Sequence, residues 1–281
     1  MKTHHIISIL LVLILNVTQV FAQEPVDSVR YQQDSAIIPE TDPTVLFFQE
    51  NEKLTDEVFA KTILITKLKK SVKLSAFLKA EDKMYPEHVL ADLDSDGIKE
   101  LVIYDFTGGA HCCDEIYIFK RIAANKYQHV VKLFAGNTII TPEKEFAYGF
   151  HEQFGYFFTC FACRLEDTGD AGPVSLSHII LKYKKGKMSV APGDVDLKST
   201  IRDNLGKLSE LPFEKIDPDL GHDNGFRKEY ALNLAVYYYS FGRNLLETQK
   251  LFYKYYKFPD AKKVWAAFSK NLLEIRKSSD F

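Results

Sequence analysis

Residues 92–104 read DLDSDGIKELVIY, an acidic loop that runs directly into an apolar segment. Within the loop, acidic side chains stand at positions 1, 3, 5 and 9, and a glycine stands at position 6. Residues 101–104 are β-branched and aromatic, apart from Leu101, which predicts a buried strand. The segment therefore predicts a sheet in which one strand begins at a loop crowded with negative charge.

The acidic side chains of this loop have a spacing that favours calcium. Calcium prefers several oxygen ligands, and alternate residues of a tight loop can converge on one ion. Gly97 permits the sharp turn, and the carbonyl of Ile98 can supply the ligand at position 7. We predict that one calcium ion is held by Asp92, Asp94, Asp96, Glu100 and the carbonyl oxygen of Ile98.

The loop does not have the pattern of an EF-hand. An EF-hand loop needs an acidic residue at position 12, where this chain has Ile103, and it needs a helix on each side. The alternative interpretation is a solvated acidic turn without a metal, because Asp and Gly are ordinary turn residues.

Residues 91–102 resemble the D-x-D-x-D-G-x-x-[DE] loop of FG-GAP and integrin-type repeats. The resemblance implies calcium binding by the side chains and the carbonyl named above. One clear copy is present, whereas a propeller needs blades at a fixed period, so the resemblance supports a site and not a propeller. When residues 108–113 (GGAHCC) are considered together with this loop, the chain is similar to a group of uncharacterised secreted bacterial proteins. This wider resemblance implies a location outside the cytoplasm and no particular activity.

The N-terminal residues predict export. Lys2 supplies a positive charge, and residues 6–15 are apolar but too short to span a bilayer. Residues 20–22 suit signal peptidase, so we predict a signal peptide over residues 1–22 and a secreted or periplasmic protein; an uncleaved anchor is the alternative. Residues 23–44 predict a flexible linker. The net charge of −2 gives no general reason to expect nucleic acid or an anionic membrane as partner, and no later segment predicts a membrane span.

We predict an α+β fold in which an antiparallel β-meander, a single propeller-like blade or a small sheet, packs against C-terminal helices. Residues 45–83 predict a helical lead-in with a helix over 54–78, although residues 62–65 can equally form a strand. Residues 84–200 then hold the β region, and residues 201–281 the helices. The predicted strands cover residues 100–105, 115–121, 127–133, 156–163, 177–183 and 188–191. The predicted helices cover residues 226–243, 245–257 and 259–277.

The four cysteines of an exported chain favour disulfides. We expect two cross-links that join Cys112 and Cys113 to Cys160 and Cys163, because adjacent cysteines bond to one another only with strain. A zinc site made by His111, Cys113, Cys160 and Cys163 is an alternative if the thiols stay reduced. A redox pair of Cys160 and Cys163 is another.

Candidate catalytic residues are few. His111 follows a glycine-rich segment, and with Asp114, Glu115 and His151 it suggests a metal-dependent hydrolase outside the cytoplasm. The acidic loop at residues 217–225 favours a helix N-cap by Asp223 or Asn224 over a second calcium site. No nucleophile motif is present, so we expect a calcium-binding interaction module for a protein or glycan, and the hydrolase is the alternative.

Overall fold

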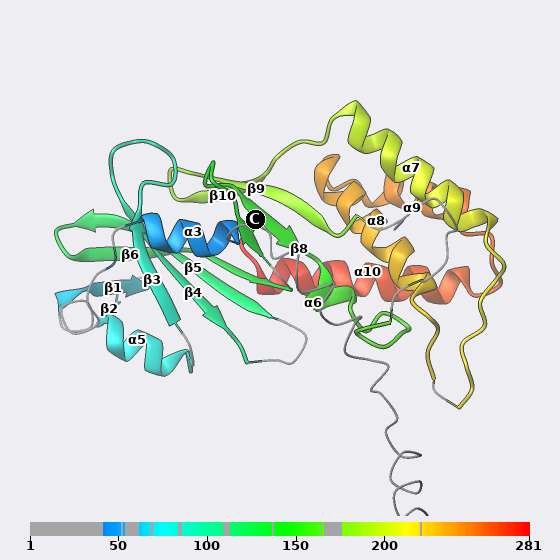
Figure 1. Ribbon diagram of the computed structural model, residues 1–281, viewed down its shortest axis with the longest axis horizontal. Helices are drawn as coiled ribbons and strands as arrows, with labels where there is room; N and C mark the ends of the chain where they lie inside the picture. The colour runs from blue at the N-terminus through cyan, green and yellow to red at the C-terminus, as the bar shows by residue number, and fades with distance from the viewer. Residues whose placement is uncertain are drawn as a thin grey trace, which may run out of the picture. The chain divides into compact units, whose positions relative to one another are not determined.

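Two β-sheets and a group of C-terminal helices build the fold (Figure 1). The computed structural model describes residues 42–51, 53, 62–67, 70–83, 86–108, 113–136, 138–163, 165, 176–219 and 221–281. The predicted signal peptide, most of the predicted linker, His111 and Cys112 lie outside these ranges. The segment from Pro43 to Phe281 is one compact unit.

The first sheet has six strands in the order β2-β1-β6-β5-β4-β3. Its strands are β1 (Leu64–Lys67), β2 (Lys70–Lys73), β3 (Pro86–Ala91), β4 (Glu100–Phe106), β5 (Asp114–Ala123) and β6 (Lys126–Ala135). Consecutive strands β3 to β6 pair antiparallel, which confirms the predicted meander, while β1 pairs parallel with β6.

Both faces of the first sheet are covered, which explains the unbroken apolar run at residues 101–103. Leu101 and Ile103 pack with Phe77 of helix α5 (Leu74–Ala80) on one face. Val102, between them, points to the other face and joins the main core with Val131. Successive residues of a strand face opposite sides, so only a doubly buried strand tolerates such a run.

The second sheet is antiparallel, with the order β10-β9-β8-β7. Its strands are β7 (Ile139–Ile140), β8 (Phe146–Gly149), β9 (His178–Lys184) and β10 (Lys187–Val190). The turn between β9 and β10 has positive φ at both Lys185 (50°) and Gly186 (83°), as a type I′ hairpin requires. The two strands of this hairpin confirm the strands predicted at residues 177–183 and 188–191.

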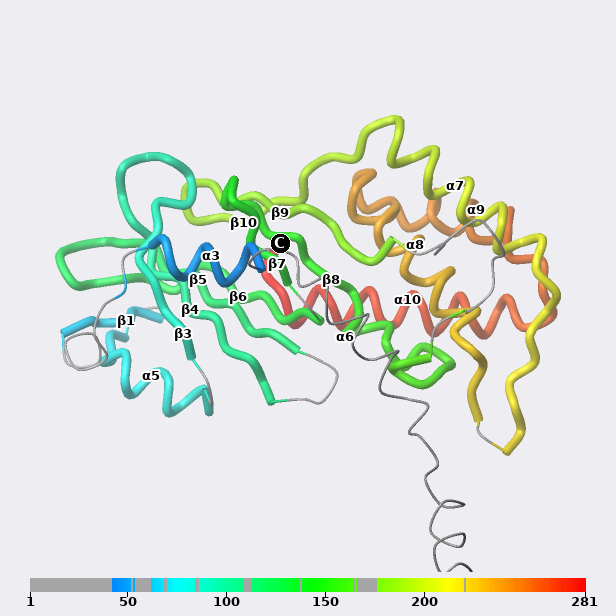
Figure 2. The backbone as a smooth tube through the Cα atoms, in the orientation of Figure 1, coloured from blue at the N-terminus to red at the C-terminus, as the bar shows by residue number. Residues whose placement is uncertain are grey.

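The helices confirm the predicted α+β class. They are α3 (Pro43–Glu50), α5, α6 (His151–Phe154), α7 (Val195–Glu210), α8 (Phe226–Ser240), α9 (Leu245–Tyr255) and α10 (Ala261–Ser278). Almost every residue of α8 is buried, because α7, α9 and α10 pack around it (Figure 2). Stacked rings join the C-terminal helices to the segment that follows β8. Phe150, directly after β8, meets Tyr239 of α8 at 5.4 Å, and Phe154 of α6 meets Phe268 of α10 at 5.6 Å between centroids.

The C-terminal residues return to the first sheet. Asp280 donates its N–H to the Lys132 carbonyl (2.7 Å) and accepts the Lys132 N–H (2.9 Å). The Ser279 hydroxyl accepts the N–H of Phe134 (2.9 Å). These bonds cover the part of the β6 edge that β1 does not reach, since β1 pairs only with residues 126–128.

Two predicted elements are wrong. The helix predicted over residues 54–78 is wrong where that segment is described, since β1, β2 and the start of α5 are found there instead. Ile65 is fully buried as part of strand β1 and not of a helix. The alternative strand at residues 62–65 was closer to the structure. Residues 156–163 form turns and bends and not a strand, since Cys160 and Cys163 are joined at the two ends of one turn.

Candidate metal centre

The acidic loop at residues 92–99 connects β3 to β4, and Glu100 is the first residue of β4. Leu93 is buried and anchors the start of the loop in the main core. Ser95 (φ 59°) and Gly97 (φ 83°) adopt left-handed backbone conformations, which let the chain reverse within a few residues.

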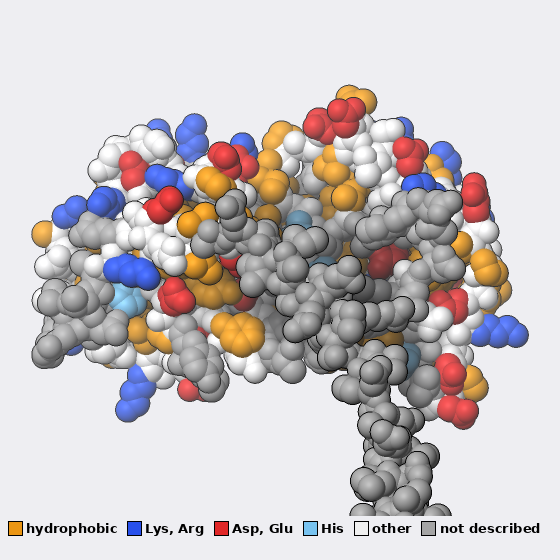
Figure 3. Space-filling model, viewed as in Figure 1, with side chains coloured by type: hydrophobic (Ala, Val, Ile, Leu, Met, Phe, Trp, Pro, Cys, Tyr) orange, Lys and Arg blue, Asp and Glu red, His pale blue; other side chains and the backbone are white. Residues whose placement is uncertain are grey.

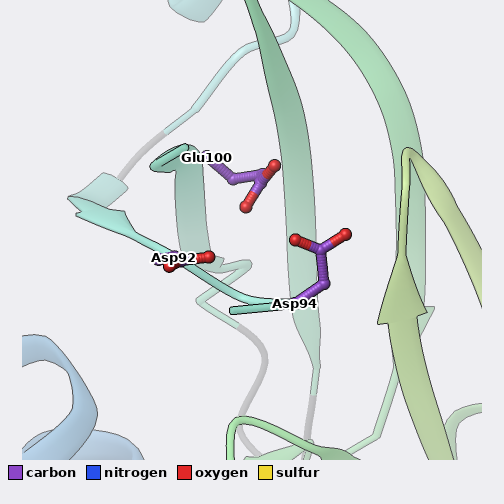
Figure 4. A group of neighbouring side chains, drawn as sticks. All are labelled: Asp92, Asp94 and Glu100. Atoms are coloured by element: carbon purple, nitrogen blue, oxygen red, sulfur yellow. The ribbon is translucent and has the colours of Figure 1, made fainter. Parts of the chain in front are cut away.

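Three of the predicted carboxylates come together. One oxygen each of Asp92, Asp94 and Glu100 lies within 4.8 Å of the other two. Figure 4 shows the three carboxylates around a shared space, with Glu100 reaching in from the strand and the aspartates from the loop. Calcium ligands lie 2.3–2.6 Å from the ion, about half of this separation, so one ion between the three oxygens is geometrically reasonable.

Glu100 is the buried member of the group, with 1% of its surface exposed. Burial, together with the smaller effect of the nearby charges of Asp94 and Asp96, raises the pKa of its carboxyl to about 7. Hydrogen bonds from the Leu93 N–H (3.2 Å) and the Tyr183 hydroxyl (3.3 Å) act in the opposite direction. No cationic side chain in the described part of the chain forms an ion pair with Glu100.

The two aspartates are held in place by backbone N–H groups. Asp92 accepts the N–H of Asp96 and of Gly97, each at 3.0 Å. Asp94 Oδ2 accepts the N–H of Lys185 in the β9–β10 turn at 2.7 Å. These bonds orient the carboxylates without neutralising them, which is how a preformed cation site is arranged.

Asp94 Oδ1 is the strongest indication that the group needs a cation. This atom is buried and has no hydrogen-bond partner among the described residues. An unsatisfied buried carboxylate oxygen costs several kcal/mol unless a cation or another donor meets it. The donor set therefore fits a hard divalent cation, for which carboxylate oxygens are the preferred ligands.

The remaining predicted ligands are not in this group. Asp96 is exposed, and its Oδ1 accepts the N–H of Ile98 at 2.8 Å. The structure therefore collects Asp92, Asp94 and Glu100, and the ligand roles predicted for Asp96 and for the carbonyl of Ile98 stay predictions.

The second sheet contributes residues that the sequence did not indicate. Lys144, in the turn between β7 and β8, donates from Nζ to the Asp92 carbonyl at 2.7 Å. Lys185 and Tyr183 of the β9–β10 hairpin bind Asp94 and Glu100, as described above. These contacts span 52 to 91 positions of sequence, so no local pattern could have found them.

The predicted disulfides are wrong for Cys160 and Cys163, which bond to each other. Their Cα atoms are 5.0 Å apart, and the Cys163 N–H reaches the Cys160 carbonyl in one tight turn. Cys113 is also disulfide-bonded, and Cys112 lies outside the described residues. Oxidised sulfurs are not the thiolates that the alternative zinc site requires. A disulfide between Cys160 and Cys163 is the oxidised form of the alternative redox pair, so that alternative stays a prediction.

The residues of the hydrolase alternative do not converge where they are described. Asp114 and Glu115 are neighbours in β5 and therefore face opposite sides of the sheet. Asp114 accepts the Tyr104 hydroxyl (2.6 Å) and the Thr138 N–H (2.7 Å), while Glu115 binds Lys83 and Lys132. Two such side chains cannot bind the same metal. His151 lies beside His178, with 6.2 Å between the ring centroids.

The second acidic loop contributes a helix cap. Asp223 is buried and accepts the N–H groups of Gly225 (2.8 Å) and Arg227 (3.2 Å) at the start of α8. It also pairs with the Arg227 guanidinium at 2.6 Å. The predicted N-cap, Asp223 or Asn224, is wrong because Gly225 occupies the N-cap position, although Asp223 still accepts an N–H of the first turn from outside the helix.

Comparison of the chain with protein-family models, curated proteins and solved structures found no match. The resemblance to FG-GAP loops therefore depends on the motif and on the grouping of its carboxylates. Within the described residues, none of the helices combines the length and apolarity of a membrane span.

Proposed function

We propose that this chain is an exported protein that binds one calcium ion through Asp92, Asp94 and Glu100. In this proposal it is a non-enzymatic interaction module for a protein or glycan partner. The observation that carries the calcium site is the buried, unpartnered Asp94 Oδ1 beside the buried Glu100. The predicted signal peptide supports the location, since calcium is abundant outside cells and weak sites are used there.

The ion has a structural role in this proposal. Asp94 and Glu100 already contact the β9–β10 hairpin through Lys185 and Tyr183. An ion between the carboxylates relieves their mutual repulsion and holds the loop against the second sheet. Because the ion binds only the folded chain, it stabilises the fold by an amount that grows with its free concentration.

The test is calcium titration by calorimetry together with thermal unfolding in calcium and in chelator. We expect wild type to bind one calcium ion and to melt at a higher temperature in calcium. Asp94→Asn removes the charge of the unpartnered carboxylate and is expected to abolish both effects. Asp203→Asn, at an exposed position of α7, is the matched control and is expected to retain them.

Magnesium provides a selectivity test. Magnesium needs near-ideal octahedral geometry and keeps several of its waters, so a loop built from three carboxylates is expected to prefer calcium. A chain that binds neither ion, or an Asp94→Asn variant that binds calcium as wild type does, contradicts the proposal.

A further inference from the structure

Four turns of the two sheets lie together at one end of the molecule, which we name the hairpin end. They are residues 92–100, 120–126, 141–145 and 182–187. Lys185 N–H binds Asp94, Lys144 Nζ binds the Asp92 carbonyl, and a Cβ placed on Gly186 would lie 3.5 Å from the Lys120 side chain. In Figure 1 these turns gather at the left, on the side opposite the C-terminal helices.

The hairpin end is basic although the whole chain is slightly acidic. Its four turns carry nine lysine or arginine residues and six acidic residues, whereas the chain has 36 and 38. The basic residues are Lys99, Lys120, Arg121, Lys126, Lys144, Lys182, Lys184, Lys185 and Lys187. Figure 3 shows lysine and arginine side chains gathered on this side of the molecule.

Several of these charges are available to a partner. Arg121, Lys184, Lys185 and Lys187 are exposed, and none of them forms an ion pair with another described residue. By contrast, Lys182 pairs with Glu145 at 2.5 Å. A surface with unpaired cations attracts polyanions over about 8–10 Å at physiological ionic strength.

Exposed aliphatic side chains stand among these cations. Ile98 is 42% exposed, Ile122 is 46% exposed, and Leu64, whose N–H binds the Asn125 carbonyl at 2.9 Å, is 39% exposed. Tyr183, the single aromatic residue of the four turns, is 5% exposed. Nucleic-acid surfaces use exposed aromatic rings for stacking, whereas basic residues mixed with aliphatic ones suit the interface of a lipid bilayer.

We infer that the hairpin end docks on an anionic phospholipid surface. The unpaired lysines contact the lipid phosphates, and Ile98 and Ile122 enter the headgroup region. The acidic loop is one of the four turns and repels the same surface, so a bound cation strengthens the docking. Only this calcium effect rests on the proposed function; the attraction of the lysines does not.

The test is co-sedimentation of the purified chain with lipid vesicles. One set contains phosphatidylcholine alone and the other contains phosphatidylglycerol as well, each measured in calcium and in chelator. We expect binding to the anionic vesicles that falls with added salt and is stronger in calcium. Anionic binding that is salt-sensitive but equal in calcium and chelator supports docking and contradicts only the inferred effect of calcium on it; the calcium site itself is tested by the calorimetry described above.

The variant Lys184→Gln, Lys185→Asn, Lys187→Gln removes three unpaired charges, with Asn chosen because Lys185 has positive φ. It is expected to weaken binding to anionic vesicles by about 100-fold. The matched control Arg202→Gln, Lys207→Gln, Lys262→Gln removes three exposed charges from the helices and is expected to bind as wild type does. The melting temperatures of both variants establish that they fold.

A second variant tests the aliphatic contribution. Ile98→Ser with Ile122→Ser is expected to weaken vesicle binding several-fold while leaving its salt dependence unchanged. Equal sedimentation with both vesicle types, an unaffected lysine variant, or tight binding to a DNA duplex without vesicle binding would overturn the inference.

Discussion

Two buried ionisable side chains, Arg227 and Glu100, differ in the partners that surround them. Arg227, 1% exposed at the start of α8, is met by Asp223 at 2.6 Å, Asp260 at 2.7 Å and the Glu214 carbonyl at 2.9 Å. Glu100, also 1% exposed, is met by one hydroxyl, one backbone N–H and two further carboxylates. The first site is complete within the chain, whereas the carboxylates of the second form no ion pair within the described part of the chain. This difference is the reason for proposing that an ion binds at the second site.

The largest expected effect is at the complete site. Arg227→Ala leaves Asp223 and Asp260 without their cation, and Asp223 is buried. We expect a loss of about 3–5 kcal/mol in the free energy of unfolding, measured by urea denaturation. Arg202→Ala, at an exposed position of α7, is the control and is expected to change stability by less than about 0.5 kcal/mol. A small change for Arg227→Ala would show that its network contributes little.

The next effect separates the two sites by their response to calcium. At a free calcium concentration about 100 times the dissociation constant, the ion is expected to stabilise wild type by about 2.7 kcal/mol. Glu100→Gln removes the buried charge, so this variant is expected to be more stable than wild type in chelator at pH 8 and to gain nothing from calcium. Urea denaturation of both proteins, with and without calcium, shows whether calcium reverses the order of their stabilities. Equal calcium gains would place Glu100 outside the site.

The pH dependence of stability tests the same carboxyl. Burial raises the folded-state pKa of Glu100 to about 7, above its ordinary value of 4.5. The folded state therefore binds the Glu100 proton more tightly than the unfolded state does. The stability that this proton contributes is fully present below pH 4.5 and is lost as the pH rises through about 7. In chelator we expect wild type to lose stability between pH 6 and pH 8, relative to Glu100→Gln, by about 1 kcal/mol. If the free energies of unfolding of the two proteins changed with pH in parallel, a raised pKa for Glu100 would be contradicted.

Calcium binding is expected to show the reverse dependence on pH. The proton and the ion compete for Glu100, so calcium affinity is expected to fall as the pH is lowered from 8 to 6. Calorimetry in two buffers of different ionisation enthalpy measures the proton released on binding. A calcium affinity that stays the same between pH 8 and pH 6 would mean that Glu100 takes no part in calcium binding.

The smallest expected effect comes from the second sheet. Tyr183→Phe removes the hydroxyl that donates to Glu100 Oε1 at 3.3 Å and leaves the ring in the core. In chelator we expect the free energy of unfolding to fall by about 0.5–1.5 kcal/mol. We also expect the affinity for calcium to be weaker than that of wild type. Tyr253→Phe, on α9, is the control for loss of a tyrosine hydroxyl, and its calcium affinity is expected to be unchanged.

The sequence was informative where structure is local. The strand after the acidic loop, the β9–β10 hairpin and helices α8, α9 and α10 follow from apolar patterns and turn residues within a few positions. The grouping of Asp92, Asp94 and Glu100 follows from their spacing in one loop. Asp96 has the right spacing but is exposed, because side-chain direction depends on the course of the folded loop.

The sequence was uninformative where distant segments meet. The parallel pairing of β1 with β6, the contact of Asp94 with Lys185 and the pairing of β8 with β9 depend on long-range packing. The disulfide prediction failed for a related reason. It assumed that residues 156–163 were a strand facing another loop, whereas a turn brings Cys160 and Cys163 to each other.

The return of Ser279 and Asp280 to β6 has a consequence for biosynthesis. These residues are translated after every other part of the sheets, yet their hydrogen bonds complete the exposed edge beside Lys132 and Phe134. While the chain is still emerging from the ribosome, that edge is open to pairing with other nascent chains. The pairing of Ser279 and Asp280 with β6 closes this edge.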